Sequence, residues 1–287
     1  MSIDSRGATP PGAIPGASAH SQAVTGTPMT TDPRVDETKA GSAIEISEVS
    51  KTFGRADTEL VALDRVSLSV APGEFVCLIG ASGCGKSTLL NLVAGLDAPT
   101  SGTVDTGGRR VSLMFQESAL FPWLTAAKNV EMPMRASGVP RAERQERVAE
   151  LLDLVQLSSF GDKRPHQLSG GMRQRVALAR SLAQDADVLL MDEPFGALDA
   201  MTRDLLHEVL EGIWRRRQLS ILFVTHEVRE AVRLGDRVVL LSSRPGRVIG
   251  EFGVDFERPR GMDSTDTVGL AIKIKDRLRE EIIRHGH

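Results

Sequence analysis

The sequence predicts an α/β fold from three observations. First, short apolar runs of strand length recur along the chain. They lie at 44–49, 66–70, 74–79, 111–115, 188–192, 221–225, 237–242 and 247–251. Second, the run at 74–79 is followed by the glycine-rich segment GASGCGKS at 80–87 and by helical spacing over 87–94. Third, the pattern becomes helical and charged between about 125 and 165, which indicates a helical subdomain inserted in the core. The apolar stripe of that segment consists of Val148, Leu151, Leu152, Leu154 and Leu157.

The glycine-rich segment 80–87 matches the P-loop pattern G-x-x-x-x-G-K-[ST]. In such a loop the backbone N–H groups cradle phosphates, Lys86 reaches the β and γ oxygens, and Ser87 is a Mg²⁺ ligand. The alternative is a glycine-rich turn that matches by chance, and the preceding strand and following helix disfavour it. The predicted nucleotide contacts are Gly80, Ser82, Gly83, Cys84, Gly85, Lys86, Ser87 and Thr88.

Two carboxylates end the apolar run at 188–192. Asp192 and Glu193 stand at the carboxyl end of a predicted parallel strand, where open α/β sheets bind their ligands. Asp192 can hold Mg²⁺, and Glu193 can orient or deprotonate a water molecule. An ordinary strand followed by an acidic turn is the alternative, and the neighbouring P-loop makes it the weaker one.

A second phosphate site is predicted at 168–172, which reads LSGGM and precedes a helical pattern. Ser169 can cap the helix, while Gly170 and Gly171 let a phosphate approach the first N–H groups. If this site and the P-loop act on the same phosphates, they converge within one chain or across two. The residues alone leave both arrangements open.

With these motifs in this order, residues 44–250 resemble the nucleotide-binding subunit of an ABC transporter. The resemblance makes 168–172 the family signature and 188–193 the Walker B strand with its glutamate. Met172 departs from the most familiar signature, which has Gln at that position. The resemblance implies a P-loop NTPase (ABC ATPase) core with an antiparallel β subdomain and a helical subdomain over about 117–180. Its remaining motifs are the Q-loop glutamine Gln116, the D-loop residue Asp199 and the switch histidine His226.

The resemblance also implies a mechanism. Two subunits meet head to tail, and each ATP lies between the P-loop of one subunit and the signature of the other, with Asp199 among the nucleotide contacts. Glu193 is the general base, and His226 contacts the γ-phosphate. Gln116 senses Mg²⁺ or water and relays the nucleotide state to the membrane subunit.

The adenine contact implied by the resemblance is Phe53, which would stack on the base. A lone aromatic residue near a strand end is usually part of a core, so core packing is the alternative. In that case Val61 or Leu63 would lie near the base instead.

Composition limits the partners. The chain has 287 residues and a formal net charge of −3, and this balance gives no electrostatic reason to expect nucleic acid. Because no run of about 18 apolar residues occurs, we expect no transmembrane helix. The two cysteines, Cys77 and Cys84, do not suggest a disulfide framework.

The domain organisation follows from shifts in composition. Residues 1–42 are rich in Ala, Pro, Gly, Ser and Thr without a periodic apolar pattern, so we expect a disordered tail. Residues 43–252 form the expected nucleotide-binding domain, and 253–287 form a C-terminal extension. The extension predicts an amphipathic helix packed on its own domain, with a partner-binding face as the alternative. Its apolar positions are Leu270, Ile274, Leu278 and Ile282.

Spacing and sequence detail favour a transport function within this family. Ser87 and Leu168 are about 80 residues apart, which leaves no room for the long insertion of DNA-repair relatives. Segments 121–125, 191–203 and 244–248 resemble the ATP-binding subunits of nitrate, sulfonate and taurine importers. The predicted function is ATP hydrolysis, with Mg²⁺, that energises uptake of a small solute. A non-transport ABC ATPase and an exporter subunit are the alternatives.

The implied location is peripheral, at the cytoplasmic face of a bacterial cell membrane. The implied partners are a second copy or a paralogous ATPase subunit, membrane permease subunits and, indirectly, a solute-binding protein. Phe121 and Trp123 fall where the family receives a coupling helix of the permease. They are either interface anchors or part of the core of the helical subdomain.

Overall fold

The computed structural model describes residues 41–54 and 59–285. Contacts divide the chain into two units, Met1–Thr38 and Lys39–His287, and the description below concerns the second. Nearly all of the tail predicted over 1–42 lies outside the described residues.

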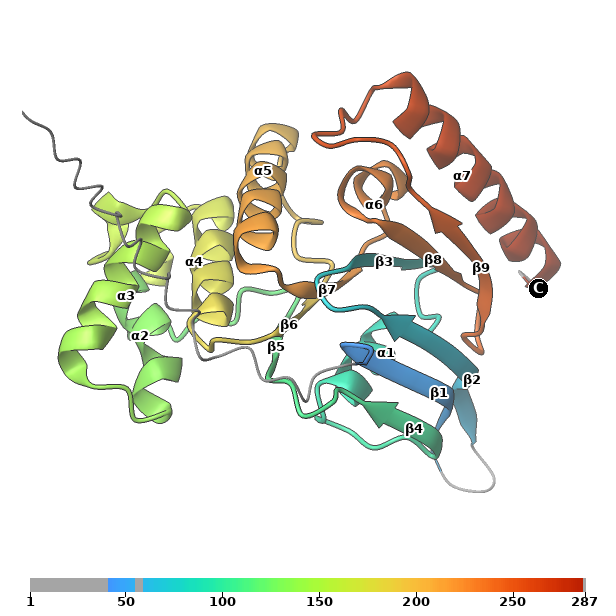
Figure 1. The fold of residues 1–287 in the computed structure, drawn as a ribbon, viewed down its shortest axis with the longest axis horizontal. Helices are drawn as coiled ribbons and strands as arrows, with labels where there is room; N and C mark the ends of the chain where they lie inside the picture. The colour runs from blue at the N-terminus through green and yellow to red at the C-terminus, as the bar shows by residue number, and fades with distance from the viewer. Residues whose placement is uncertain (1–40, 55–58, 286–287) are drawn as a thin grey trace, which may run out of the picture. The chain divides into compact units, whose positions relative to one another are not determined.

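A six-stranded sheet forms the centre of this unit, in the order β5-β6-β7-β3-β8-β9 (Figure 1). Its bounds are Phe75–Gly80 (β3), Val111–Met114 (β5), Val188–Asp192 (β6), Ser220–Val224 (β7), Arg237–Leu241 (β8) and Val248–Gly253 (β9). The strands are parallel except that β9 pairs antiparallel with β8. All residues of β3 and β7 are buried, which explains their continuous apolar runs. Because β6, β7 and β3 are neighbours, the loops at their carboxyl ends lie side by side.

A second, antiparallel sheet has the order β2-β1-β4. Its strands are Ile44–Phe53 (β1), Leu60–Val70 (β2) and Ser101–Asp105 (β4). The sequence does not predict β4, because its side chains are mostly exposed and carry no apolar run. Gly102 has φ +83°, and a Cβ there would lie 2.4 Å from the carbonyl oxygen of Glu48. Glycine is therefore required where β4 crosses the irregular pairing of β1.

Four helices flank the sheets or follow their strands: α1 (Lys86–Val93), α4 (Gly170–Leu182), α5 (Ala200–Arg217) and α6 (Val228–Leu234). Three of them match predicted helical patterns, and α5 does not. Helix α5 buries His207 and Glu211 along with apolar residues, and these polar positions interrupt the apolar spacing that marks a helix. Within the described part of the chain, no helix is both long and apolar enough to cross a membrane.

The chain between β5 and β6 forms the helical subdomain. Helices α2 (Ala126–Ala136) and α3 (Arg141–Leu154) pack on each other and on α4, and Figure 1 shows α2 and α3 grouped beside α4, away from the sheets. Leu154 of the predicted stripe is only partly buried. The buried members of that stripe are Val148, Leu151, Leu152 and Leu157.

The last helix, α7 (Thr265–His285), packs against α6 (Figure 1). Ile274 is buried, and Leu270 and Leu278 are partly buried against the main core. The predicted packing of this helix on its own domain is therefore confirmed over these turns. Ile282 departs from the predicted stripe, because 44% of its surface is exposed.

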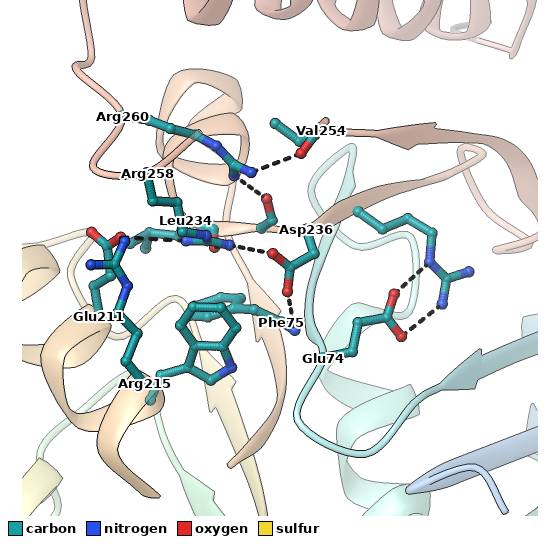
Figure 2. A network of polar contacts seen from close by, with 12 residues as sticks. Glu74, Phe75, Glu211, Arg215, Leu234, Asp236, Val254, Arg258 and Arg260 are labelled. Atoms are coloured by element: carbon teal, nitrogen blue, oxygen red, sulfur yellow. Dashed lines mark hydrogen bonds and ion pairs between the residues drawn. The ribbon is translucent and has the colours of Figure 1, made fainter. Parts of the chain in front are cut away.

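Two arginines fasten the segment that leads from β9 to α7 (Figure 2). Arg258 donates hydrogen bonds to the carbonyl oxygen of Leu234 at 2.6 Å and to Oδ1 of Asp236 at 2.7 Å. Arg260 is buried and donates to the carbonyl oxygen of Val254 at 2.7 Å, and burial lowers its pKa to about 10. These bonds satisfy backbone carbonyls near the end of α6 and after β9, so they hold the segment against the domain.

Candidate nucleotide-binding site

The loop between β3 and α1 is shaped by glycines in left-handed conformations. Gly83 has φ +73° and Gly85 has φ +101°. A Cβ on Gly85 would lie 2.7 Å from Cδ2 of Leu63, so both conformation and space require glycine there. Gly85 is also the N-cap of α1 and brings no side chain to the helix start. The first N–H groups of α1 are therefore available to an anion such as phosphate.

Lys86 is held inside this loop. Its Nζ donates hydrogen bonds to the carbonyl oxygens of Gly80 at 2.9 Å and Ala81 at 3.0 Å, and only 6% of the residue is exposed. Nζ also lies 3.9 Å from Sγ of Cys84, whose side chain is buried. Burial raises the pKa of the Cys84 thiol, so this cysteine is a neutral packing group.

Ser87 and Asp192 meet across the sheet edge. The Ser87 hydroxyl interacts with the Asp192 carboxylate at the end of β6. Burial raises the pKa of Asp192, the Ser87 hydrogen bond opposes this shift, and the charge of Glu193 adds to it. Both side chains offer the hard oxygen ligands that Mg²⁺ prefers. Residues 41–54 and 59–285 hold no cluster of three or more His, Cys, Asp or Glu side chains that could hold a metal ion.

Glu193 and His226 also lie together. Oε2 of Glu193 is 3.0 Å from Nδ1 of His226, and the glutamate side chain is 23% exposed. The backbone N–H of Glu193 donates to the carbonyl oxygen of Val224 in β7 at 3.0 Å. Glu193 has φ +42°, a conformation that is uncommon outside glycine. The bond to β7 holds the glutamate in this conformation, with its carboxylate toward the histidine.

A buried network supports the turn that carries His226, and the sequence did not predict it. The hydroxyl of Thr225 donates to one oxygen of the Glu230 carboxylate, and the other oxygen lies 2.6 Å from Nε2 of His207. Oγ1 of Thr225 also accepts a hydrogen bond from the N–H of Glu227 at 3.0 Å. His207 is fully buried and Glu230 is 4% exposed. The residues on both sides of His226 are therefore tied to α5 and α6.

A cavity of about 370 Å³ lies over the P-loop. It brings together predicted residues from β1, the P-loop, the Q-loop and the end of β6. Gly80 and Cys84 do not line it: the first accepts a bond from Lys86, and the second is buried. The predicted residues that line it are Phe53, Ser82, Gly83, Gly85, Lys86, Ser87, Thr88, Gln116 and Glu193.

Part of the cavity lining is apolar. Phe53 is 41% exposed and lines it, while Nζ of Lys51 lies 5.0 Å from its ring centroid. Leu63 is fully buried, and Val61, although exposed, is not among the lining residues. Of the three candidates for the adenine contact, Phe53 alone adjoins the cavity. Its ring thus has both a cation partner and an exposed surface on which a base can stack.

The predicted contacts in the signature and the D-loop do not line this cavity. Ser169 is the N-cap of α4, and its Oγ accepts a hydrogen bond from the N–H of Met172 at 3.2 Å. A Cβ on Gly171 would lie 2.3 Å from Cγ2 of Thr202, so glycine lets α4 approach the start of α5. Asp199 is the N-cap of α5 and bonds Thr202. Besides Gly80 and Cys84, the predicted site residues that do not line the 370 Å³ cavity are Ser169, Gly170, Gly171, Asp192, Asp199 and His226.

Two further residues join the site without having been predicted. Nε2 of Gln174, buried on α4, donates to the carbonyl oxygen of Gln116 at 2.8 Å and so links the Q-loop to the signature helix. Arg244, in the turn between β8 and β9, lines the cavity and hydrogen-bonds Gly83, 161 positions away in the chain. No local pattern marks either residue, because each acts through a partner that is distant in sequence.

The fold and the loop define a P-loop nucleotide-binding protein, and comparisons with known proteins identify the family. The ABC transporter family model matches residues 63–196. The nitrate import ATP-binding protein NrtD of Synechocystis sp. is 48% identical, over 74% of this chain and 83% of its own length. The taurine import ATP-binding protein TauB of Rhizobium johnstonii is 48% identical, over 77% and 87%. This chain belongs to the family of ABC transporter ATP-binding proteins.

Solved structures agree with this assignment. The dimeric structure of a bacterial ABC transporter cassette has a TM-score of 0.66 and 34% identity, and the match covers 75% of this chain and 100% of that one. A dimeric post-hydrolysis cassette bound to ADP and phosphate has the same TM-score and coverage at 33% identity. The predicted ABC ATPase fold, with its antiparallel sheet and inserted helices, is confirmed.

Proposed function

We propose that this chain is the ATP-binding and ATP-hydrolysing subunit of an ABC importer. One observation carries the proposal. At the adjacent carboxyl ends of β6, β7 and β3, the Glu193–His226 pair and the Ser87–Asp192 pair stand beside the loop that holds Lys86. This combines a phosphate cradle, hard oxygen ligands and a carboxylate base, which are the parts that phosphoryl transfer to water requires.

Different residues bind the nucleotide, hold the metal ion and activate water. The P-loop N–H groups and Lys86 bind the β- and γ-phosphates, and Phe53 stacks on adenine. Ser87 and Asp192, with Gln116, hold Mg²⁺, which when bound neutralises phosphate charge. Glu193 accepts a proton from the attacking water, and the neighbouring histidine fixes the carboxylate and contacts the γ-phosphate.

A second ATPase subunit completes the site. Ser169, Gly170, Gly171 and Asp199 do not line the cavity over the chain's own P-loop, and the two similar solved cassettes are dimers. Both facts support the arrangement across two chains rather than within one. The partner is a second copy or a paralogous ATPase subunit, and each signature helix start binds the γ-phosphate of the other chain's ATP.

The importer assignment rests on the relatives, which are named for nitrate and taurine import. The cargo is therefore a small solute of the nitrate, sulfonate or taurine kind, delivered by a solute-binding protein to a membrane permease. The chain lies at the cytoplasmic face of the bacterial membrane as a peripheral subunit. The rings of Phe121 and Trp123 are 5.5 Å apart, and Trp123 is 68% exposed, which favours an anchor for the permease over a core role.

The proposed domain boundaries are those expected from composition. They comprise a tail over 1–42, the nucleotide-binding domain over 43–252 with its helical subdomain at about 117–180, and the extension over 253–287.

The direct test of the proposed function is reconstitution of the full chain with its permease in liposomes. Solute-stimulated ATP hydrolysis with accumulation of solute supports the proposal. ATP hydrolysis that no permease or solute-binding protein alters would instead favour a non-transport ATPase.

A further inference from the structure

Arg244 lines the nucleotide cavity, but none of the functions proposed so far involves this residue. Its Nε and Nη2 donate hydrogen bonds to the carbonyl oxygen of Gly83 at 3.1 and 3.0 Å. A Cβ on Gly83 would lie 3.2 Å from Nη2, so the guanidinium rests directly on the P-loop. The residue is exposed and lines the same cavity as Lys86 and Phe53.

The turn that presents Arg244 is closed on itself. The N–H of Ser242 donates to the carbonyl oxygen of Arg247 at 2.9 Å, and the Ser242 hydroxyl donates to that of Pro245 at 2.7 Å. The N–H of Arg247 donates back to the Ser242 hydroxyl at 2.9 Å. These bonds span the turn between β8 and β9, so the base of the arginine side chain is fixed.

The same turn is also fixed against the P-loop and β2. The N–H of Gly246 donates to the carbonyl oxygen of Ala62 at 2.9 Å, and its own carbonyl accepts from the N–H of Asp64 at 3.0 Å. A Cβ on Gly246 would lie 2.3 Å from the carbonyl oxygen of Cys84, so glycine allows this close approach. Backbone contacts of the fold therefore hold the turn beside the P-loop.

The Arg244 guanidinium has more N–H donors than its bonds to Gly83 use. A guanidinium carries five N–H groups in a planar fork that suits phosphate oxygens. Two of the five donate to Gly83, and the described residues provide no bond for the other three. A cation with unused donors, fixed at the wall of a polar cavity, is suited to a polyanion.

We propose that Arg244 is a further nucleotide-binding residue, which tethers the P-loop through Gly83 and binds the polyphosphate of ATP with its remaining N–H groups. The inference rests on the proposed nucleotide site and extends it by a cation from the turn between β8 and β9. It also gives this turn a function that its distance in sequence from the P-loop conceals.

Arg247 provides a matched control in the same turn. It forms an ion pair with Asp64 and lines a separate cavity with Glu48, Arg65 and Ser67, away from the P-loop. The variants are Arg244→Gln, Arg244→Lys and Arg247→Gln in the full chain. Calorimetry would measure binding of Mg²⁺ with the non-hydrolysable analogue AMP-PNP at about 0.05 and about 0.5 M NaCl.

Arg244→Gln should weaken binding about tenfold at low salt, because a charge-assisted contact is lost. The deficit should shrink at high salt, since screening weakens the contact in the wild type. Arg244→Lys keeps the charge but not the planar fork, so its affinity should fall between those of Arg244→Gln and the wild type. Arg247→Gln should bind like the wild type.

Three results would overturn the inference: unchanged binding by Arg244→Gln, an equal loss in Arg247→Gln, or a loss that salt does not alter. The last would indicate stacking on adenine or a purely structural tether. Lys86→Ala separates this failure from that of the proposed site. If the wild type binds no AMP-PNP, or Lys86→Ala binds it equally well, the nucleotide site itself is wrong.

Discussion

Oε2 of Glu193 lies 3.0 Å from Nδ1 of His226 although the two residues are 33 positions apart. Their meeting follows from strand register: Asp192 at the end of β6 pairs with Val224 at the end of β7. Glu193 directly follows β6 and His226 comes two residues after β7, so both emerge at the same sheet edge. The fold itself thus brings the carboxylate and the imidazole together, which is the kind of preorganisation that base catalysis requires.

Glu193→Gln should lower the rate of ATP hydrolysis about a thousandfold, because an amide cannot accept the proton of the attacking water. ATP binding should persist, since the P-loop contacts are unchanged, and the dimer should be trapped with ATP. Single-turnover kinetics and gel filtration with MgATP would measure the two effects. Steady turnover near the wild-type rate would exclude Glu193 as the base.

Lys86→Ala should weaken ATP binding at least about tenfold, because the ammonium that meets the phosphates is removed. Titration with a fluorescent ATP analogue measures the affinity. Lys128→Ala is the control, since Lys128 pairs with Glu131 on the surface of α2. Equal affinity in both variants would contradict the P-loop assignment.

Asp192→Asn should abolish Mg²⁺-dependent hydrolysis and yet raise the melting temperature by about 2 °C at neutral pH. Burial raises the folded-state pKa of Asp192 above its unfolded value. The ionised carboxylate therefore destabilises the fold above that pKa, and the cost is relieved as pH falls through it. Scanning calorimetry should show the gap between variant and wild type narrowing on acidification.

Asp64→Asn should change the stability of the fold in the opposite direction to Asp192→Asn. The hydrogen bond from Arg247 lowers the pKa of Asp64, so the ionised form stabilises the fold above the unfolded pKa. This substitution should lower the melting temperature at neutral pH, and the difference should fade as pH falls through the folded pKa. Shifts of the same sign in both variants would contradict the electrostatic account.

Ser169→Arg should block hydrolysis while each P-loop still binds ATP, because the N-terminus of α4 would carry a bulky cation in place of its cap. The informative measurement is a mixed dimer of Ser169→Arg with Lys86→Ala. If sites form across chains, both changes fall in one composite site, and the other site keeps its Lys86 and Ser169. If each site lies within one chain, each chain carries one of the two changes and no site is intact. Residual single-site activity of the mixed dimer therefore distinguishes sites across chains from sites within one chain.

Glu230→Ala should destabilise the fold by about 3 kcal/mol, because it removes the buried carboxylate that bonds both His207 and Thr225. It should also reduce hydrolysis, since the turn carrying His226 loses its support. Urea unfolding followed by tryptophan fluorescence measures the first effect. Glu208→Ala, one residue after His207 on α5 but exposed, is the control and should cost less than about 1 kcal/mol.

Local patterns predicted most of the fold. The central strands read as apolar runs because both faces of that sheet are buried, and α1 and α6 follow recognisable loops. Strand β4 and helix α5 escaped prediction for opposite reasons: β4 is too exposed to show a pattern, and α5 buries polar residues within its pattern. Ile282 fits the apolar spacing of α7 but is exposed, because spacing alone does not tell how far a helix stays in contact.

The sequence by itself determined the P-loop, the carboxylates after β6 and the signature, because each consists of neighbouring residues whose chemistry depends on local backbone geometry. Only the tertiary structure decided which of them share a cavity. It joined Glu193 to His226 through strand register, placed Arg244 on Gly83 and buried His207 beneath the switch turn. These contacts link residues far apart in the chain, and no local pattern encodes a partner that folding alone brings near.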